Sequence, residues 1–386
     1  MVIDQEITQL KDYARKHRRE LHKIPELGFN EYKTNTYLKN KLKALDLNFE
    51  ESAQTGLLVF FDRKAKRTVA FRSDMDALNI EELNDISYKS TIKGNMHACA
   101  HDGHMAMLLT FGKYLKAHEE DLRVNILLIF QPAEEGPGGA EVLIKEGLID
   151  TYKIDEIYGM HLYPDILEGK IGLRKGPMMA SVGELKVTLH GKSSHGAMPH
   201  LGIDTIAIAA LFITQLQQII SREIHPTTSG VVSIGKITGG TGTNIIAEKV
   251  EMYGTLRTFD STTNKFIQKR IKDILLGLKQ TYGIKFETDF KDMYPVVDND
   301  VELAEDFIKA NGKECIEEIP LQMVSEDFSY YQKEIPGLFV FLGVRNEKKG
   351  YDNGLHNSKF NFDEKNLLTG VQSYINVMKY KKYLED

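Results

Sequence analysis

Short apolar runs typical of buried strands alternate with segments of helical periodicity, and this alternation constrains the fold more than any other feature. Three such runs are TVAFR at 68–72, VNILLIF at 124–130 and IDEIYG at 154–159. Segments 31–45 and 103–116 carry apolar residues at spacings of three and four, as amphipathic helices do. Because strands that alternate with helices build a mostly parallel sheet, we predict an α/β fold.

The pattern changes in the middle of the chain and then returns. Residues 180–293 read as strand, helix, two strands, helix and strand, which is the β-α-β-β-α-β order of ferredoxin-like domains. A strand at 338–342 and a closing helix at 364–384 then resume the α/β pattern. The chain, at 386 residues, is also long for a single core. We therefore expect a discontinuous α/β domain of residues 1–179 and 294–386, with residues 180–293 inserted into it.

Charge and hydropathy exclude several classes of protein. A formal net charge of −6 argues against a nucleic-acid partner, which requires a basic surface. The apolar runs are too short to cross a bilayer, and the N-terminal segment MVIDQEITQLKDYARKHRRELHK has no apolar signal core. With only two cysteines, Cys99 and Cys315, a structural disulfide is not expected. We therefore expect a cytoplasmic protein that binds neither nucleic acid nor membrane.

The densest group of possible metal ligands is MHACAHDGH at 96–104. Cys99 and His101 are two residues apart, so on an extended or looping backbone their side chains point to the same side. A thiolate and an imidazole in this arrangement could bind one divalent ion. Alternatively, the segment is a polar loop with an incidental cysteine.

Further ligand types follow strands of the expected sheet. Glu134 and Glu135 come directly after the run VNILLIF, and His161 and His356 each follow a later strand. The carboxyl ends of parallel strands meet at one edge of a sheet, where α/β proteins build their sites. Adjacent carboxylates there can divide the work, one binding metal and the other moving protons. The alternative for the two glutamates is a solvated helix N-terminus, where Glu is also favoured.

Five side chains are therefore candidate metal ligands, namely Cys99, His101, Glu135, His161 and His356. They are too many for one catalytic ion, which typically has three protein ligands and a water. They suit two divalent ions that share a bridging ligand. A Cys, His and carboxylate set accepts Zn, Mn, Co or Ni, and the order of metal affinities alone does not select one of them. We expect Mn or Zn.

Ten motifs are spread over nearly the whole chain: RRELHKIPELGFNEYKT (18–34), RSDMDAL (72–78), MHACAHDGH (96–104), FQPAEEGPGGA (130–140), GMHLYP (159–164), SSHGAMPH (193–200), GGTGTNIIAE (239–248), GTLRTF (254–259), SEDFSYY (325–331) and LHNSKF (355–360). With them the chain resembles the amidohydrolase branch of the aminoacylase/carboxypeptidase metallopeptidases. That branch includes hippurate hydrolases, indoleacetate–amino acid conjugate hydrolases and N-acetyl-diaminopimelate deacetylases. The resemblance implies a metal-binding catalytic α/β domain, and an inserted ferredoxin-like lid domain through which two chains form a homodimer.

The chain departs from the family pattern at Ala100, where relatives usually have Gly. If this position requires a positive φ, Ala strains it by about 1 kcal/mol.

The resemblance also implies roles for residues around the metals. Glu134 is expected to be the general acid/base that moves protons, and Glu135 a metal ligand, in the hydrolysis of N-acyl amino acids. Asp76 in RSDMDAL follows a strand and is expected to orient a ligand or tune the metals. Asp74 stands where many relatives have a ligand His, and we expect it to act in support.

Three residues of the inserted domain have expected roles as well. His195 resembles the lid histidine that stabilises the oxyanion in the partner chain's site, although it could be a surface-loop histidine. Asn244 and Arg257 resemble residues that hold the substrate carboxylate, and Arg suits this by bidentate pairing.

The residues alone leave other functions open. A dipeptidase or carboxypeptidase would use the same two metals and also cut an amide beside a free carboxylate. A non-catalytic binding protein would have no need of Glu134 and five metal ligands. Cys99 as a nucleophile is the weaker alternative, because a metal-bound thiolate has its lone pairs engaged. The sequence does not select the acyl group or the amino acid.

Overall fold

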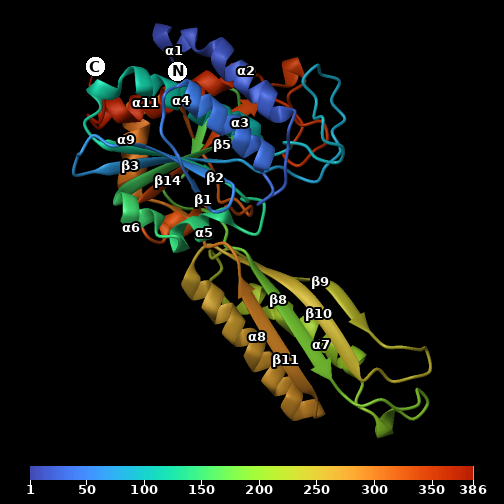
Figure 1. Ribbon diagram of the computed structural model, residues 1–386. Helices are drawn as coiled ribbons and strands as arrows, with labels where there is room; N and C mark the ends of the chain where they lie inside the picture. The colour runs from blue at the N-terminus through green and yellow to red at the C-terminus, as the bar shows by residue number, and fades with distance from the viewer. Residues whose placement is uncertain (386) are drawn as a thin grey trace. The chain divides into compact units, whose positions relative to one another are not determined.

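The computed structural model describes residues 1–385 and divides the chain into two compact units (Figure 1). Unit 1 comprises Met1–Gly176, Asp298–Pro320 and the chain from Glu326 onward, and unit 2 comprises Pro177–Val297 and Leu321–Ser325. The short segment Leu321–Ser325 belongs to unit 2 through its backbone. Gln322 accepts a hydrogen bond from the Ala180 N–H at 2.9 Å and donates one to the Met178 carbonyl at 2.9 Å.

Unit 1 is built on an eight-stranded sheet in the order β1-β2-β4-β3-β5-β14-β6-β13. Strand β3 pairs in parallel with β4 and β5, and β5 in parallel with β14, whereas β2 runs antiparallel to β4. The central sheet is thus mostly parallel, which confirms the α/β prediction. The strands are β1 (Glu50–Ser52), β2 (Gly56–Phe61), β3 (Thr68–Asp74), β4 (Asn125–Gln131), β5 (Ile154–Leu167), β6 (Ile171–Leu173), β13 (Ile316–Glu318) and β14 (Gly337–Arg345).

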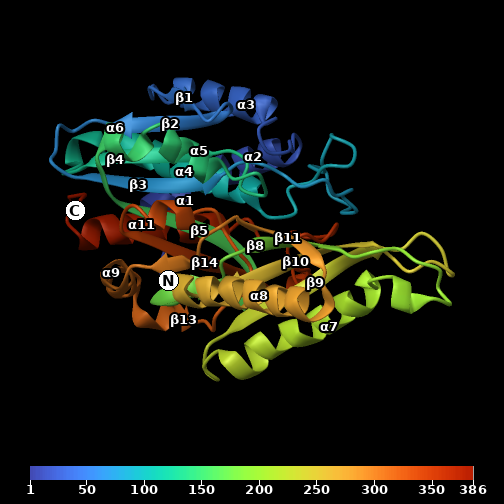
Figure 2. The ribbon, with the colours of Figure 1, turned by 90° about the horizontal axis from the view of Figure 1, so that it is seen from below.

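Helices cover this sheet (Figures 1 and 2). The core of unit 1 includes Phe71 of β3, whose ring lies 4.9 Å from those of Phe111 in α4 and Tyr374 in α11. All three rings are buried, as the apolar pattern of the strand and the two helices predicts. The helices are α1 (Gln5–Gln9), α2 (Lys11–His22), α3 (Tyr32–Ala44), α4 (His101–Ala117), α5 (Gly139–Lys145), α6 (Leu148–Tyr152), α9 (Val301–Asn311), α10 (Ser329–Gln332) and α11 (Asn366–Tyr380). Among the described residues, none of the helices combines the length and apolarity needed to span a membrane.

Strand β5 is longer than the sequence indicated, and this changes the position of His161. We expected the strand to end at residue 159, with His161 just past it; that expectation was wrong, because β5 continues to Leu167. The reason is pairing: β14 accompanies β5 as far as Leu167, whereas β3 accompanies it only as far as Gly159. His161 therefore lies inside a strand, beyond the point where its neighbour β3 stops pairing. The closing helix α11 is shorter than the expected 364–384.

Unit 2 contains a four-stranded sheet in the order β11-β8-β10-β9, in which every adjacent pair is antiparallel. Two helices lie along one face of this sheet (Figures 1 and 2). Apolar residues of β8 and of both helices form the core between them. Asp204 and Asp260 cap the two helices by accepting hydrogen bonds from backbone N–H groups of the first turn. The elements are β8 (Gly183–His190), α7 (Thr205–Gln218), β9 (Gly230–Gly239), β10 (Lys249–Thr258), α8 (Ser261–Tyr282) and β11 (Lys285–Asp292). Strands β7 (Gly176–Met179) and β12 (Val297–Asn299) lie where the chain passes between the units.

Candidate metal centre

The segment MHACAHDGH forms the loop before α4 and the first turn of that helix. Cys99 precedes the helix, and His101 is its first residue. Glu135, just beyond the end of β4, reaches the same place: Cys99, His101 and Glu135 each offer a possible ligand atom within 4.8 Å of the others. The structure therefore brings together three of the five expected ligands as one group.

Ala100, between Cys99 and His101, has a left-handed backbone with φ 66° and ψ 12°. The position at which the sequence pattern led us to ask about a positive φ thus does have one. A left-handed Ala costs about 1 kcal/mol relative to Gly, and this chain bears that cost in the loop that holds two candidate ligands.

The remaining two expected ligands adjoin this group. His161 Nε2 lies 3.4 Å from Cys99 Sγ, while His161 Nδ1 lies 2.8 Å from the Leu162 carbonyl oxygen. His356 Nε2 lies 3.2 Å from Glu135 Oε1. The His356 backbone N–H donates to the Ala98 carbonyl at 2.9 Å, which attaches the C-terminal loop to the segment before α4.

Asp76, just past β3, connects the two loops of the centre. Its carboxylate accepts the backbone N–H groups of Glu134 and Glu135 at 3.1 and 3.0 Å. The same residue contacts His101, whose Nδ1 is 2.9 Å from the Asp76 carbonyl oxygen and 3.2 Å from the carboxylate. In the neutral ring, donation from Nδ1 would leave Nε2 of His101 as the nitrogen with a free lone pair.

The electrostatics of the centre favour positive charge. Although burial opposes it, the carboxylates of Asp74 and Asp76 raise the pKa of His101 to about 10. Burial and the carboxylates of Glu135 and Glu134 raise the pKa of the Cys99 thiol well above its usual range. Without a cation nearby, Cys99 is therefore a neutral thiol, which does not support its role as a nucleophile.

One buried atom tests whether these residues fit a metal. His101 Nε2 has no hydrogen-bond partner among the described residues. A buried polar atom is rarely left in this state, and a cation would supply the missing partner. Thiolate, imidazole and carboxylate donors are those that Zn and related divalent ions use. The residues thus fit a metal centre.

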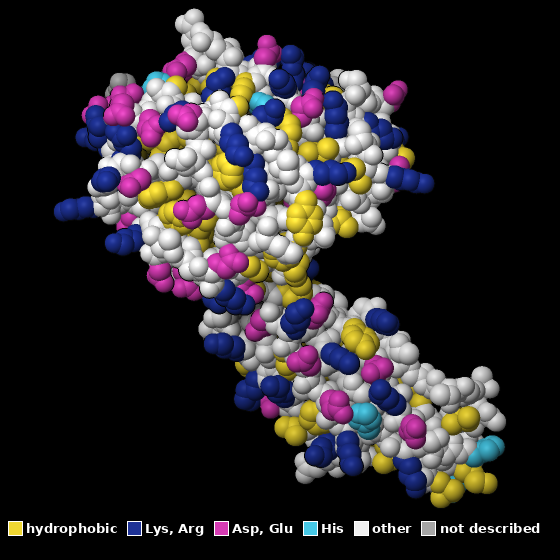
Figure 3. Space-filling view, viewed as in Figure 1, with side chains coloured by type: hydrophobic (Ala, Val, Ile, Leu, Met, Phe, Trp, Pro, Cys, Tyr) yellow, Lys and Arg dark blue, Asp and Glu magenta, His cyan; other side chains and the backbone are white. Residues whose placement is uncertain are grey.

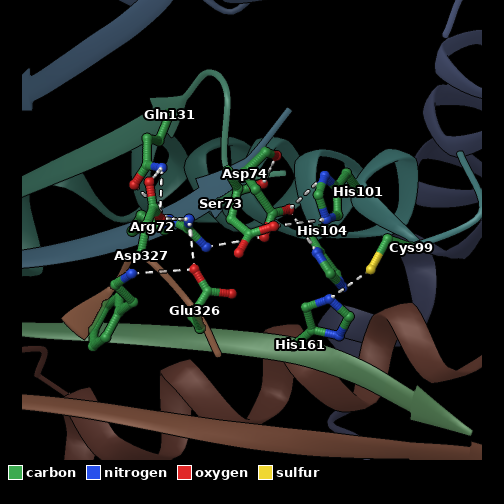
Figure 4. A network of polar contacts seen from close by, with 12 residues as sticks. Arg72, Ser73, Asp74, Cys99, His101, His104, Gln131, His161, Glu326 and Asp327 are labelled. Atoms are coloured by element: carbon green, nitrogen blue, oxygen red, sulfur yellow. Dashed lines mark hydrogen bonds and ion pairs between the residues drawn. The ribbon is translucent and has the colours of Figure 1, made fainter. Parts of the chain in front are cut away.

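A second group of possible metal ligands shares His101 with the first. It is formed by Asp74, His101, His104 and His161 (Figure 4). His104 already uses both ring nitrogens, because Nδ1 is 2.7 Å from Asp74 Oδ1 and Nε2 accepts the Leu162 N–H at 2.9 Å. Binding a metal would break one of these bonds. We interpret Asp74 and His104 as support for the ligand-bearing strands and helix.

Arg72 organises a buried network that we did not predict as part of the site (Figure 4). Its guanidinium donates to Gln131 at 2.8 Å, to Asp74 at 2.9 Å, and to Glu326 and Asp327 at 2.9 and 2.7 Å. A charged residue at the end of the apolar run TVAFR, and adjacent acids in SEDFSYY, were the available signals. Their contact is invisible in sequence because 254 residues separate Arg72 from Glu326.

Glu134 faces this network. Glu134, Glu326 and Asp327 each offer a carboxylate oxygen within 4.8 Å of the others, and His101 Nε2 lies 4.0 Å from Glu134 Oε2. Burial, with the carboxylates of Glu326, Glu135 and Asp327, holds the pKa of Glu134 well above its usual range. Although burial opposes it, His356 and His101 hold the pKa of Glu135 below its usual range. The two adjacent glutamates thus differ in proton affinity, as a proton carrier and a metal ligand should.

The other three expected site residues lie in unit 2. His195 is exposed, and its Nδ1 accepts the Ala197 N–H at 3.0 Å. Gly196 donates to the Asn244 carbonyl at 2.7 Å, so the segments that carry His195 and Asn244 lie side by side. Arg257 of β10 donates to the Met323 carbonyl at 3.1 Å.

Comparison with known proteins extends these observations. Residues 70–380 match the sequence pattern of Peptidase family M20/M25/M40. The N-acetyldiaminopimelate deacetylase of Exiguobacterium sibiricum is 38% identical over 361 residues, which cover 92% of this chain and 95% of that protein. Thermostable carboxypeptidase 2 of Saccharolobus solfataricus is 37% identical over 378 residues, covering 96% of this chain and 95% of that protein. The crystal structure of a dinuclear metal-binding M20 peptidase from Bacillus subtilis has a TM-score of 0.84 at 29% identity, covering 96% of this chain and 98% of the other.

Proposed function

The chain belongs to peptidase family M20/M25/M40, and from this premise we propose that it is a metal-dependent amidohydrolase acting on N-acyl amino acids, for example N-acetyl amino acids. The observation that carries the proposal is the convergence of Glu134 on the group formed by Cys99, His101 and Glu135. A proton carrier beside a candidate metal centre is what hydrolysis of an unactivated amide requires.

Cys99, His101, Glu135, His161 and His356 would hold two divalent ions per chain, with Mn or Zn expected and Co or Ni as alternatives. When bound, such ions polarise an amide carbonyl and lower the pKa of an attacking water. Asp76 holds the backbone of Glu134 and Glu135 and contacts His101, which supports an orienting role for it.

Glu134 would move the proton. Its carboxylate takes a proton from the attacking water and returns it to the nitrogen of the leaving amine. A raised proton affinity suits this task, because the group must hold the proton between the two transfers. No covalent step on Ser or Cys is needed.

A substrate screen on protein of known metal content tests the proposal. The protein is purified without added metal, its metals are measured by elemental analysis, and acetyl-, benzoyl- and aminoacyl-amino acids are assayed. We expect two metal equivalents per chain and release of the acyl group from N-acyl amino acids. Absence of metal, or no hydrolysis of any N-acyl amino acid, would contradict the proposal.

A carboxypeptidase or dipeptidase is the second candidate, favoured by the likeness to thermostable carboxypeptidase 2. It would use the same residues, because both reactions cut an amide beside a free carboxylate. Faster hydrolysis of aminoacyl-amino acids than of acetyl- and benzoyl-amino acids in the same screen would select it.

Cys99→Ser is expected to weaken or empty one metal position, because a hydroxyl is a far poorer anionic ligand than a thiolate. The measurement is metal content per chain after equilibration with limiting Zn²⁺. Cys315→Ser is the matched control, since Cys315 is buried but belongs to no possible metal-binding group among the described residues. Equal metal content in the two variants would remove Cys99 from the ligand set.

The residues of unit 2 would act on the substrate. Because His195 Nδ1 accepts a backbone N–H, the proton of the neutral ring is on Nε2, which is then a donor suited to an oxyanion. We propose that His195 serves the partner chain's centre and that Asn244 and Arg257 hold the substrate carboxylate, Arg257 by a bidentate pair.

A homodimer would form through unit 2. Hydrophobic side chains gather at one end of this unit, at the lower right of Figure 3. An exposed cluster of this kind favours association with another protein surface. The exposed large apolar residues of unit 2 include Met198 (51%), Leu201 (53%), Ile206 (48%), Ile237 (51%) and Ile245 (44%).

His195→Ala is expected to lower the rate by roughly 10²–10³ with metal content unchanged, because it removes an oxyanion donor and no ligand. If the donor acts across the dimer, a mixture of inactive His195→Ala and Glu134→Gln chains should regain activity. Each mixed dimer would contain one centre with both an intact His195 and an intact Glu134.

The control for this mixing experiment is subunit exchange itself, followed with two differently tagged chains. If mixed dimers form and stay inactive, His195 acts within its own chain or not at all.

A further inference from the structure

A buried charged cluster outside the ligand set holds the first turn of α4. Asp102 is fully buried and follows the candidate ligand His101. Its Oδ2 accepts a hydrogen bond from Arg18 Nε at 2.8 Å and lies 2.8 Å from His22 Nδ1. Both partners come from α2, which ends at His22. One oxygen beside the metal-binding loop is thus held by two residues of a distant helix.

Arg18 and His22 are themselves fixed by other parts of unit 1. His22 Nε2 lies 3.1 Å from Glu82 Oε1, so the ring bridges two carboxylates. Arg18 donates to Tyr88 at 3.0 Å and to Asn361 at 2.9 Å. Since both side chains are about 1% exposed, solvent does not compete for these bonds.

The loop that these bonds hold is one that needs support. Ala100, two residues before Asp102, has the strained left-handed backbone described above. His101 must present Nε2 toward Cys99 and Glu135 from the first helical residue, where no preceding turn restrains it. A residue that fixes Asp102 therefore fixes the direction of its neighbour His101.

We propose that His22 is a positioning residue for the metal centre, acting through its Nδ1 bond to Asp102. Arg18 acts on the same oxygen. The inference rests on the proposed metal-dependent function, and it assigns a purpose to the motif RRELHK, which contributes no ligand. The contact with Glu82 orients the His22 ring, and the bond to Asp102 fixes the first turn of α4 against that ring.

Two substitutions of His22 separate the two bonds. An Asn amide nitrogen replaces Nδ1 of a histidine, whereas a Gln amide nitrogen replaces Nε2. His22→Asn therefore keeps the donor to Asp102, and His22→Gln keeps only the contact with Glu82. We expect His22→Gln to bind Zn²⁺ or Mn²⁺ about 10–100-fold more weakly than the wild type in competition with a chelator, and His22→Asn to bind within a few-fold.

A second readout does not depend on metal. Amide hydrogen exchange over His101–Met105 should accelerate in His22→Gln but not in His22→Asn. Arg19→Met is the control for disturbance of α2, because Arg19 is partly exposed, pairs with Glu364 and does not contact Asp102 among the described residues. It should change neither readout.

Equal behaviour of His22→Asn and His22→Gln in both measurements, whether both resemble the wild type or both are impaired, would overturn the inference. If the wild type binds no metal, the proposed function fails, and the exchange comparison still decides whether His22 positions the loop.

Discussion

Glu134→Gln is expected to retain both metals and to lose turnover by roughly 10²–10⁴ in kcat, because it removes the proton carrier and no ligand. The amide has nearly the shape of the carboxylate, so the buried surroundings of Glu134, with Glu326 and Asp327 nearby, should keep their packing. The measurement is kcat on the best N-acyl amino acid of the screen, with metal content determined on the same sample.

Glu135→Gln is the matched comparison, since it changes the adjacent residue in the same way. It should lose metal, because an amide is a poorer ligand than the carboxylate that groups with Cys99 and His101. If instead Glu134→Gln loses metal and Glu135→Gln keeps it, the roles of the two glutamates are reversed.

Arg72→Met is expected to lower the free energy of unfolding by about 3–5 kcal/mol, the usual cost of removing one partner from a buried ionic network. The guanidinium is about 1% exposed and faces three carboxylates, those of Asp74, Glu326 and Asp327. Without it, these carboxylates must stay charged without the guanidinium or take up protons. Urea unfolding of the metal-free protein followed by circular dichroism measures the loss.

Arg67→Met provides the control, because Arg67 directly precedes β3, the strand that carries Arg72. Arg67 is 49% exposed and 3.5 Å from Glu156, so its loss should cost less than about 1 kcal/mol. Arg72→Lys should fall between the two, since an ammonium keeps the charge but cannot reach all four acceptors that the guanidinium fork serves. Equal stability of Arg72→Met and Arg67→Met would show that the network does not hold unit 1 together.

Much of the fold was predictable because it depends on local pattern. The apolar runs at 68–72 and 124–130 became β3 and β4, since short, nearly continuous apolar runs suit strands of a sheet that is covered on both faces. The departure from Gly at Ala100 likewise marked a left-handed position, because backbone sterics act within a single residue.

The candidate site was predictable only in part. Ligand types that follow strands indicated the region of Glu135 and His356, because parallel strands end at one edge. The length of β5 was missed: its continuation through His161 depends on β14, a strand more than 150 residues away, and a strand's own residues do not reveal where its partner ends.

The sequence by itself thus determined the class of fold, the order of elements and the residue types available for chemistry. Only the tertiary structure showed which of those residues lie together and which of their side-chain atoms already have partners. His104 has the same chemistry as His101, but both of its nitrogens are engaged, while Nε2 of His101 has no hydrogen-bond partner among the described residues. Arg72 and His22 meet their carboxylates across 254 and 80 residues. Such contacts arise from packing between distant segments, and no periodicity or spacing along the chain records them.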